Sequence, residues 1–282
     1  MEDGELYPWA TNEPLNLADS LIVQSMKQTD VARSLQYNLV KVHGIFMLFA
    51  WWVFGSAAIL TARFMKNFFT GRRLAGSPIW FQIHRTFMIL ALILQCLAFA
   101  AIFVQAGDFK MCTLACETDY YLLKLHTILG VSCTSGALFQ PLLAFFRFSN
   151  EDPRRPIFNW LHWFVGVGSW TMASVCIFLA PFLPKNGLRY HFGYKADYIM
   201  AGYICSFILT SISMEILSSL CSNSKITPIV ISNRPKKSSN VDDLASVNKF
   251  SKIQVINLIL FAIVSCFLCI ALGALIALNE LI

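Results

Sequence analysis

The chain has 282 residues, of which 56% are hydrophobic and only 13% are charged, and its mean hydropathy is +0.59. A soluble domain is nearer half apolar and one quarter charged, so this composition excludes an ordinary soluble protein. The formal net charge of +6 is not a nucleic-acid signal, because the basic residues lie in the connectors between long apolar runs and follow a membrane-topology pattern.

Six apolar runs are long enough to cross about 30 Å of hydrocarbon as helices. They predict membrane spans near 42–62, 86–106, 121–146, 161–183, 197–220 and 253–278. We therefore expect an all-α polytopic membrane protein with six transmembrane helices, in which spans one to four form a four-helix core. The expected divisions are a polar N-terminal tail, the core, a basic unstructured loop, and the sixth span with the C-terminus, at 1–36, 37–220, 221–252 and 253–282.

Basic residues are distributed unequally between the two sides of the predicted membrane. The connectors 63–85, 147–155 and 221–252 hold fourteen Lys and Arg residues, whereas the N-terminal tail and the other connectors hold eight. The positive-inside rule then places both termini outside the cytosol, in the plasma membrane or an endomembrane. The acidic start of the chain has no apolar signal-peptide core, so either the first span acts as the signal or an upstream secreted portion is missing.

Two cysteines differ from the others in their expected surroundings. Cys112 and Cys116 fall in a connector on the outer side, where a disulfide persists, and a bridge between them is one of two alternatives, the other being free thiols. The remaining cysteines are mostly scattered along the spans, where a small apolar thiol is the expected role.

Four of the five histidines stand near the starts of four consecutive spans, at His43, His84, His126 and His162. Because consecutive spans alternate in direction, His43 and His126 should share one depth near the outer face. By the same argument, His84 and His162 should share a depth near the inner face. Each pair joins helices that run parallel and can face each other across a four-helix bundle. Ionisable residues at membrane depth are costly and usually mark function.

Small and flexible residues recur one helical turn after these histidines. Gly130 follows His126 by four residues and Gly166 follows His162 by four, so each glycine lies on its histidine's face and lets a flat group approach. Met47 and Met88 stand four residues after the other two histidines. They are placed to pack against the edge of such a group or, as an alternative, to act as axial ligands.

The donor set favours haem over zinc. Zinc requires three or four protein ligands, whereas each pair offers only two imidazoles. Two imidazoles in line supply both axial positions of a haem iron. We therefore expect an outer haem on His43 and His126 and an inner haem on His84 and His162, with irons roughly 20 Å apart along the membrane normal. Two axial imidazoles leave no open iron position, which favours electron transfer.

Several motifs resemble those of the cytochrome b561 family, and within it the ferric-chelate reductase branch, also called stromal-cell-derived receptor two. They are H-G-I-F-M-L-F-A-W from His43, A-R-F-M-K from Ala62, W-F-Q-I-H-R from Trp80, L-H-T-I-L-G from Leu125, Q-P-L-L-A-F-F-R from Gln140 and R-R-P-I-F-N-W-L-H-W from Arg154. The resemblance covers about residues 37–220. It implies two b haems on the four histidines, with electrons passing from cytosolic ascorbate to a ferric chelate outside. The DOMON and reeler domains usual in this branch do not fit in residues 1–36, so we expect this chain to lack them.

An ascorbate anion needs positive charge near the inner haem, and basic residues of the inner connectors can provide it. We expect the ascorbate side to use Arg63, Lys66 and Arg155, with Arg85 and Arg147 nearby, although each is also a normal membrane anchor. On the outer side, Lys124 and His191, with Lys41, are candidates for holding an anionic acceptor. His191 has a purely structural alternative as a loop residue.

The sequence leaves several functions open beside ferric reduction. A monodehydroascorbate reductase of a vesicle lumen differs only in its acceptor. In a non-redox transporter, Glu215 and the bend at Pro141 would line a path, and a haem-free membrane interaction protein is the remaining alternative. The expected partners are ascorbate, a ferric chelate or monodehydroascorbate, and the lipid bilayer, with a homodimer left open.

Overall fold

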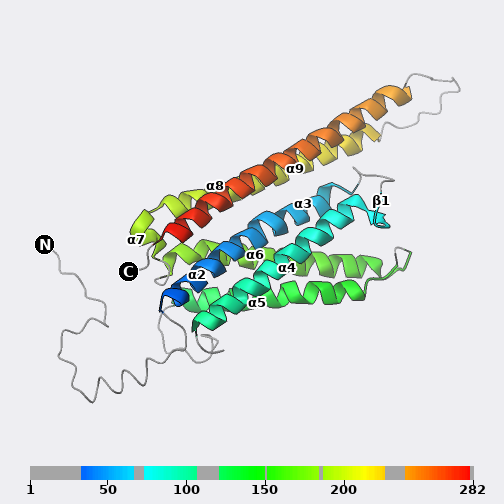
Figure 1. Cartoon of the computed structure of the whole chain (residues 1–282). Coiled ribbons are helices and arrows are strands. Elements are labelled where there is room, and N and C mark those ends of the chain that lie inside the picture. Colours follow the sequence, from blue (N-terminus) through cyan, green and yellow to red (C-terminus); the bar gives the residue numbers. More distant parts are fainter. Residues whose placement is uncertain are drawn as a thin grey trace, which may run out of the picture.

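The computed structural model describes residues 33–66, 73–106, 121–149, 151–183, 187–225 and 239–279. In these segments, the helices long and apolar enough to cross a membrane are Leu35–Phe64, Ile79–Ala106, Tyr121–Phe145, Arg155–Phe182, Lys195–Leu220 and Lys252–Leu278. They lie side by side as three antiparallel hairpins (Figure 1). The prediction of a six-span helical membrane protein is confirmed.

The first hairpin is formed by spans one and two. Span one begins with α2 (Arg33–Leu48), continues through a π-helical segment, η1 (Phe49–Gly55), and ends with α3 (Ser56–Phe64). Span two is α4 (Ile79–Ala106). A two-stranded turn of β1 (Arg73–Leu74) and β2 (Ser77–Pro78) precedes α4 and is a small departure from the all-α expectation. Its two central residues, Ala75 and Gly76, both have positive φ, as tight hairpin turns of this kind require.

The other two hairpins contain spans three to six. The second hairpin is α5 (Tyr121–Phe145) and α6 (Arg155–Leu179), which is followed by η2 (Ala180–Phe182). The short α7 (Leu188–Phe192) leads into the third hairpin, which consists of α8 (Lys195–Lys225) and α9 (Ser239–Leu278). Both helices of the third hairpin extend into the segment 221–252, which we expected to be unstructured.

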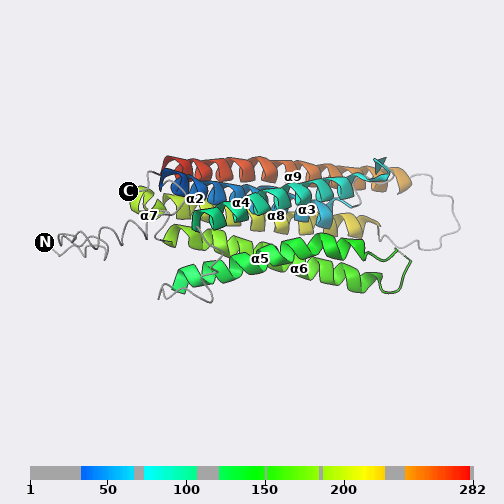
Figure 2. The same cartoon turned by 60° about the horizontal axis from the view of Figure 1, so that its bottom comes forward.

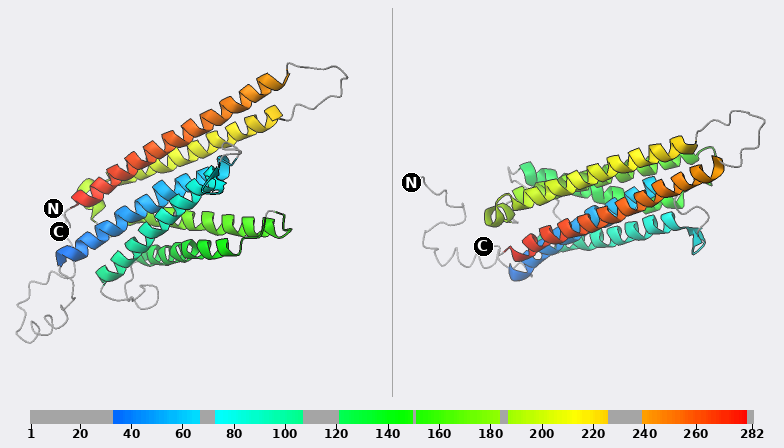
Figure 3. Two further views of the ribbon diagram at one scale, coloured as in Figure 1. Left: turned by 45° about the vertical axis from the view of Figure 1, so that its right-hand side comes forward. Right: turned by 90° about the horizontal axis from the view of Figure 1, so that it is seen from above.

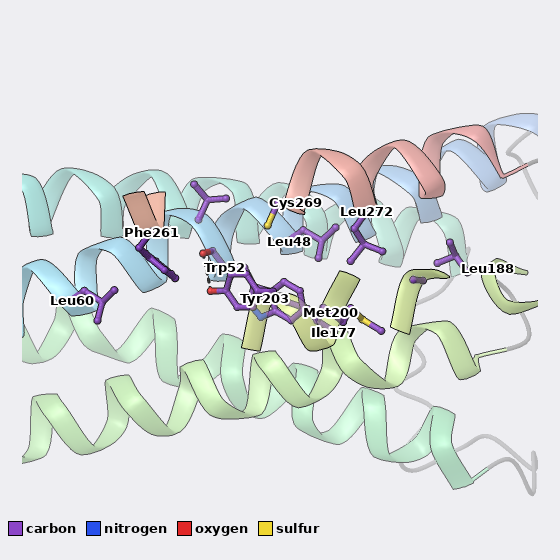
Figure 4. Close-up of a cluster of buried hydrophobic side chains, with 12 residues drawn as sticks. Leu48, Trp52, Leu60, Ile177, Leu188, Met200, Tyr203, Phe261, Cys269 and Leu272 are labelled. Atoms are coloured by element: carbon purple, nitrogen blue, oxygen red, sulfur yellow. Dashed lines mark hydrogen bonds between the residues drawn. The ribbon is translucent and has the colours of Figure 1, made fainter. Parts of the chain in front are cut away.

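Buried apolar side chains gather where span one meets α6, α8 and α9. Two further views show the α8–α9 hairpin lying along span one, with the α5–α6 hairpin on another side (Figures 2 and 3). At the centre of this core, the rings of Trp52 and Tyr203 stack with centroids 4.0 Å apart and planes within 5° of parallel (Figure 4). Helices in lipid gain little hydrophobic free energy from each other, so close packing and interhelical hydrogen bonds hold them together.

Close backbone approach holds the α5–α6 hairpin together. A Cβ built on Gly136 of α5 would overlap the hydroxyl of Ser169 on α6, so only glycine fits without a shift. That hydroxyl is itself held by a 2.8 Å hydrogen bond to the backbone carbonyl of Val165. Small residues at a membrane helix contact allow this short separation.

Candidate functional site

The structure brings the four histidines together as two separate pairs. The ring centroids of His43 on α2 and His126 on α5 are 6.4 Å apart, with 65° between the ring planes. Those of His84 on α4 and His162 on α6 are 6.3 Å apart, with 70° between the planes. Each pair therefore joins the first hairpin to the second, in the combinations expected from the alternating direction of the spans.

The spacing within each pair fits two ligands of one iron. Two imidazoles bound in line on opposite sides of a metal, through bonds of about 2.0 Å, have ring centres roughly 6 Å apart. Among the described residues, no group of three His, Cys, Asp or Glu side chains gathers at a potential metal site. A tetrahedral zinc site therefore lacks ligands in this part of the chain, whereas an iron with four porphyrin nitrogens needs only the two imidazoles.

Two of the four imidazoles are oriented by hydrogen bonds to backbone carbonyls. Nδ1 of His43 lies 2.9 Å from the carbonyl oxygen of Ala98, and Nδ1 of His84 lies 3.1 Å from that of Ala58. A carbonyl can only accept, so Nδ1 must carry the proton in both rings. The lone pair of Nε2 is then free for a metal, and the Nδ1 hydrogen bond increases its basicity as a ligand.

The other two imidazoles are held through their backbones. The Nδ1 atoms of His126 and His162 are buried and have no hydrogen-bond partner within the described segments. The carbonyl of His126 accepts from the Cys176 thiol at 3.4 Å, and the carbonyl of His162 accepts from Nε2 of Gln140 at 2.9 Å. These Nδ1 atoms do not identify the metal-binding nitrogen. The fit to a metal therefore rests on the spacing of the two pairs and on the free Nε2 atoms of His43 and His84.

The contacts repeat with one spacing along the helices. Gln140 of α5 bonds to His162 and lies 14 residues after His126. Cys176 of α6 bonds to His126 and lies 14 residues after His162. In α4, Ala98 also follows His84 by 14 residues. In span one, however, Ala58 follows His43 by 15 residues. The π segment η1 lies between them and absorbs the extra residue, because its i→i+5 pattern adds a residue to a turn.

The residues one turn after the histidines are not equivalent. A Cβ on Gly130 would meet nothing within 4 Å, which leaves open space beside His126. At Gly166, Nε2 of Gln140 lies 3.1 Å from the corresponding position, so this glycine accommodates the glutamine side chain. Met47 and Met88 are partly buried on the same helices as His43 and His84.

Three arginines and two phenylalanines form a cluster that reaches the His84–His162 pair through Phe158. The guanidinium groups of Arg85 and Arg147 lie 5.9 and 5.0 Å from the centre of the Phe81 ring. Arg155 lies 5.4 Å from the Phe158 ring, which stacks on the His162 imidazole with centroids 5.7 Å apart and planes within 14°. Burial and the nearby positive charge of Arg155 lower the pKa of Arg147.

Three carboxylates in the described segments, those of Asp152, Asp197 and Glu215, pair with cations outside this cluster. Glu215 of α8 lies 3.3 Å from Arg63, an exposed pair, and Asp152 lies 2.9 Å from Arg154. Of the predicted ascorbate-side residues, Arg63 therefore has a carboxylate neighbour, whereas Arg155 forms no ion pair with a described residue. Nζ of Lys66 lies 5.5 Å from the centre of the Trp80 ring, and Trp80 precedes His84 by four residues on α4.

The predicted outer-face residues are spread over different elements. Lys124 lies half a turn before His126 on α5 and is partly buried, whereas Nζ of Lys41 donates to the carbonyl of Ala277 at 2.9 Å. The exposed His191 lies on α7 beside the rings of Tyr190 and Phe192, and α7 packs against η2, α8 and α9. Cys112 and Cys116 fall outside the described residues.

Sequence reasoning missed four features of these sites, which are η1, Gln140, Cys176 and Phe158. The stacking of Phe158 on His162 had a detectable signal, since the two residues are four apart on one helix and share a face. The other three depend on contacts between spans that no local pattern reveals.

The chain is similar to known proteins over most of its length. A family model for eukaryotic cytochrome b561 matches residues 42–181. Proteins named "Ferric-chelate reductase 1" are 33% identical over 219 residues in Homo sapiens, 32% over 219 residues in Mus musculus and 35% over 178 residues in Bos taurus. These alignments cover 76%, 76% and 63% of this chain but only 34%, 34% and 28% of the relatives.

The chain thus spans about one third of the length of these curated relatives. No solved structure matches it. The family match includes all four paired histidines and ends at Pro181, just after α6. The chain, with its core at residues 42–181, belongs to the cytochrome b561 family.

Proposed function

We propose that this protein carries electrons across the membrane from cytosolic ascorbate to a ferric chelate on the opposite side. The observation that supports this most directly is the presence of two imidazole pairs, with centroids 6.4 and 6.3 Å apart, on four antiparallel spans. His43 and His126 would hold one b-type haem, and His84 and His162 a second. When bound, such haems supply one-electron redox centres.

The chain's own residues would prepare each site for its haem. The carbonyls of Ala98 and Ala58 fix the tautomer and the ring orientation of His43 and His84, so each Nε2 is ready to bind. Gly130 provides the open space that a flat ring needs beside His126. If both imidazoles of a pair bind the iron, no position is left for oxygen, which suits electron transfer better than oxygen chemistry.

The arginines around the inner pair support ascorbate as the reductant. Arg85, Arg147 and Arg155 carry positive charge that no carboxylate in the described segments neutralises, and their planar guanidinium groups suit bidentate contact with an enolate or carboxylate. Lys66 adds a fourth cation near His84. We propose that these residues, with Arg63 at the margin, hold the anionic donor within reach of the inner site.

The name of the relatives supports a ferric chelate as the acceptor, since those proteins are called ferric-chelate reductase. On the outer side, Lys41 and Lys124 each lie two residues before an outer-pair histidine. Because Nζ of Lys41 donates to the Ala277 carbonyl, Lys124 is the preferred candidate. We propose that it attracts an anionic chelate, with a lesser contribution from His191. The positive-inside distribution of Lys and Arg supports an outer position for the His43–His126 pair.

Spectroscopy of the purified full chain tests the cofactor assignment. We expect a reducible low-spin b-type spectrum with about two haems per chain. His43→Ala or His126→Ala should abolish one haem component, and His84→Ala or His162→Ala the other. His191→Ala is the matched control and should keep both components, because His191 lies in neither pair. A colourless wild-type protein, or loss of both components in every variant that still folds, would refute the two-haem assignment.

A vesicle assay tests the direction and the substrates. Protein is reconstituted in one orientation, with ascorbate on the side of the inner arginines and ferric citrate on the other. Stopped-flow absorbance should show haem reduction, followed by ferrous iron production across the membrane. Haem reduction without any ferric reduction would reject the acceptor while keeping the electron-transfer core.

A further inference from the structure

The π segment of span one is bonded from outside by two other spans. The Trp52 carbonyl, in the middle of η1, lies 2.9 Å from the Tyr203 hydroxyl of α8 and 2.8 Å from the Ser265 hydroxyl of α9. The Tyr203 bond to Trp52 lies in the core drawn in Figure 4. Side chains that bond to helix carbonyls are a recognised cause of departures from α-helical geometry.

The network extends to α6 with a consistent direction of donation. The indole N–H of Trp170 donates to the Ser56 hydroxyl at 2.8 Å, and Ser56 lies 2.6 Å from the Tyr203 hydroxyl. The Tyr203 proton goes to the Trp52 carbonyl, and the single Ser56 proton goes either to the Tyr203 oxygen or to the Trp51 carbonyl at 3.1 Å. Each hydroxyl proton in the network therefore has an acceptor. Ser56, Tyr203 and Ser265 are fully buried, so water does not replace these bonds.

The network stabilises a segment on which the inner histidine site depends. Ala58 follows η1 by three residues, and its carbonyl is the partner of the His84 imidazole. Without the extra residue of the π turn, Ala58 would be turned by about 100° around the helix relative to His43. Its carbonyl would then no longer face α4 while His43 still faced Ala98.

We propose that Tyr203 and Ser265 are positioning residues for the His84–His162 site. By holding the Trp52 carbonyl they maintain the π segment, which keeps the Ala58 carbonyl in register with Nδ1 of His84. The α8–α9 hairpin, beyond the family match at 42–181, thereby tunes the inner histidine through span one. This inference rests on the proposed function, because it takes the His84–His162 pair to hold a haem.

The test is a redox titration of the full haem-loaded chain carrying Tyr203→Phe, Ser265→Ala or both. Tyr203→Phe removes only the hydroxyl and keeps the ring that stacks on Trp52. Loss of the Ala58 bond makes His84 a less basic ligand, which favours ferrous over ferric iron. We expect the midpoint potential of the inner haem to rise, most in the double variant, with its low-spin electron paramagnetic resonance signal altered and the outer haem unchanged.

Two substitutions in α8 serve as controls. Tyr198→Phe removes a hydroxyl from an exposed ring, and Ser211→Ala removes one that bonds to its own helix at Phe207. Neither should change a potential. Because His84→Ala abolishes the inner component, that variant identifies which of the two potentials has moved.

Hydrogen–deuterium exchange gives a second measurement that does not depend on haem. Peptides covering residues 49–58 should exchange faster in the double variant than in wild type or either control. Unchanged potentials with unchanged exchange, in a protein holding two haems, would overturn the positioning role and leave the proposed function intact. Equal shifts of both haems would also overturn it, since the inference concerns His84 alone. Absence of haem from the wild-type chain would instead refute the proposed function.

Discussion

The contact between Gly136 and Ser169 gives a quantitative prediction for the α5–α6 hairpin. A Cβ at Gly136 would overlap the Ser169 hydroxyl but would lie 3.5 Å from the Ser169 Cβ, an ordinary contact distance. Gly136→Ala must therefore rotate the hydroxyl away from the Val165 carbonyl or separate the helices. Overpacking of this kind costs about 1–3 kcal/mol. The same exchange also gains roughly 0.5–1 kcal/mol from lower backbone freedom in the unfolded state.

Gly202 of α8 provides the matched control. A Cβ there would meet nothing within 4 Å. Gly202→Ala therefore gives the same stabilisation from lower backbone freedom in the unfolded state, without the overlap. The free energy of unfolding of Gly136→Ala should lie about 1–3 kcal/mol below that of Gly202→Ala. Adding Ser169→Ala should recover most of this difference, because it removes the atom that overlaps. Ser169→Ala alone should cost only about 1 kcal/mol for its hydrogen bond.

Reversible unfolding in mixed micelles measures all five proteins, and a double-mutant cycle isolates the coupling between positions 136 and 169. Equal unfolding free energies for Gly136→Ala and Gly202→Ala would refute the close-contact reasoning. A double variant no more stable than Gly136→Ala would show that the strain lies elsewhere than in the Ser169 hydroxyl.

Three further predictions concern the inner side of the protein. Arg147→Gln and Arg155→Gln should each raise the KM for ascorbate in steady-state reduction assays while both haems remain bound, and an unchanged KM would exclude these residues from donor binding. Phe158→Leu should alter the inner low-spin electron paramagnetic resonance signal alone, because Phe158 stacks on His162; a change in both signals would contradict this local role. Arg63→Gln should change the free energy of unfolding by less than about 1 kcal/mol, since its pair with Glu215 is exposed, and a larger loss in thermal unfolding would show a buried role.

Much of the architecture follows from the sequence because the bilayer imposes it. Hydrocarbon thickness sets a minimum length for an apolar run, so the number and approximate positions of the spans could be predicted. The alternating direction of the spans also predicted which histidines should meet. The ends of α8 and α9 could not be predicted as well. Polar, Ser-rich sequence predicted a loop at 221–252, yet α8 continues to Lys225 and α9 already begins at Ser239.

The π segment is the clearest case of a feature that local sequence does not encode. Residues 49–55 are apolar and aromatic and are typical of an ordinary membrane helix. The hydroxyls that bond to it belong to Tyr203 and Ser265, about 150 and 210 residues later in the chain. Helical periodicity carries no information about such partners. The same limit applies to Ala98 and Ala58. They act through backbone carbonyls, which every residue has, so the residue type does not indicate the role.

The recurring 14-residue interval has a consequence for the two ends of the molecule. Inverting each hairpin end for end would exchange its two histidines and the positions of their supporting contacts. The differences are the one added residue in span one and the replacement of the Cys176 thiol by the Gln140 amide. The imidazole framework is therefore nearly palindromic and cannot by itself tell one leaflet from the other. Any preferred direction of electron transfer must therefore come from residues around the histidines, above all from the guanidinium groups at the inner end. Transplanting those charges to the opposite end would be the most direct way to attempt a reversal.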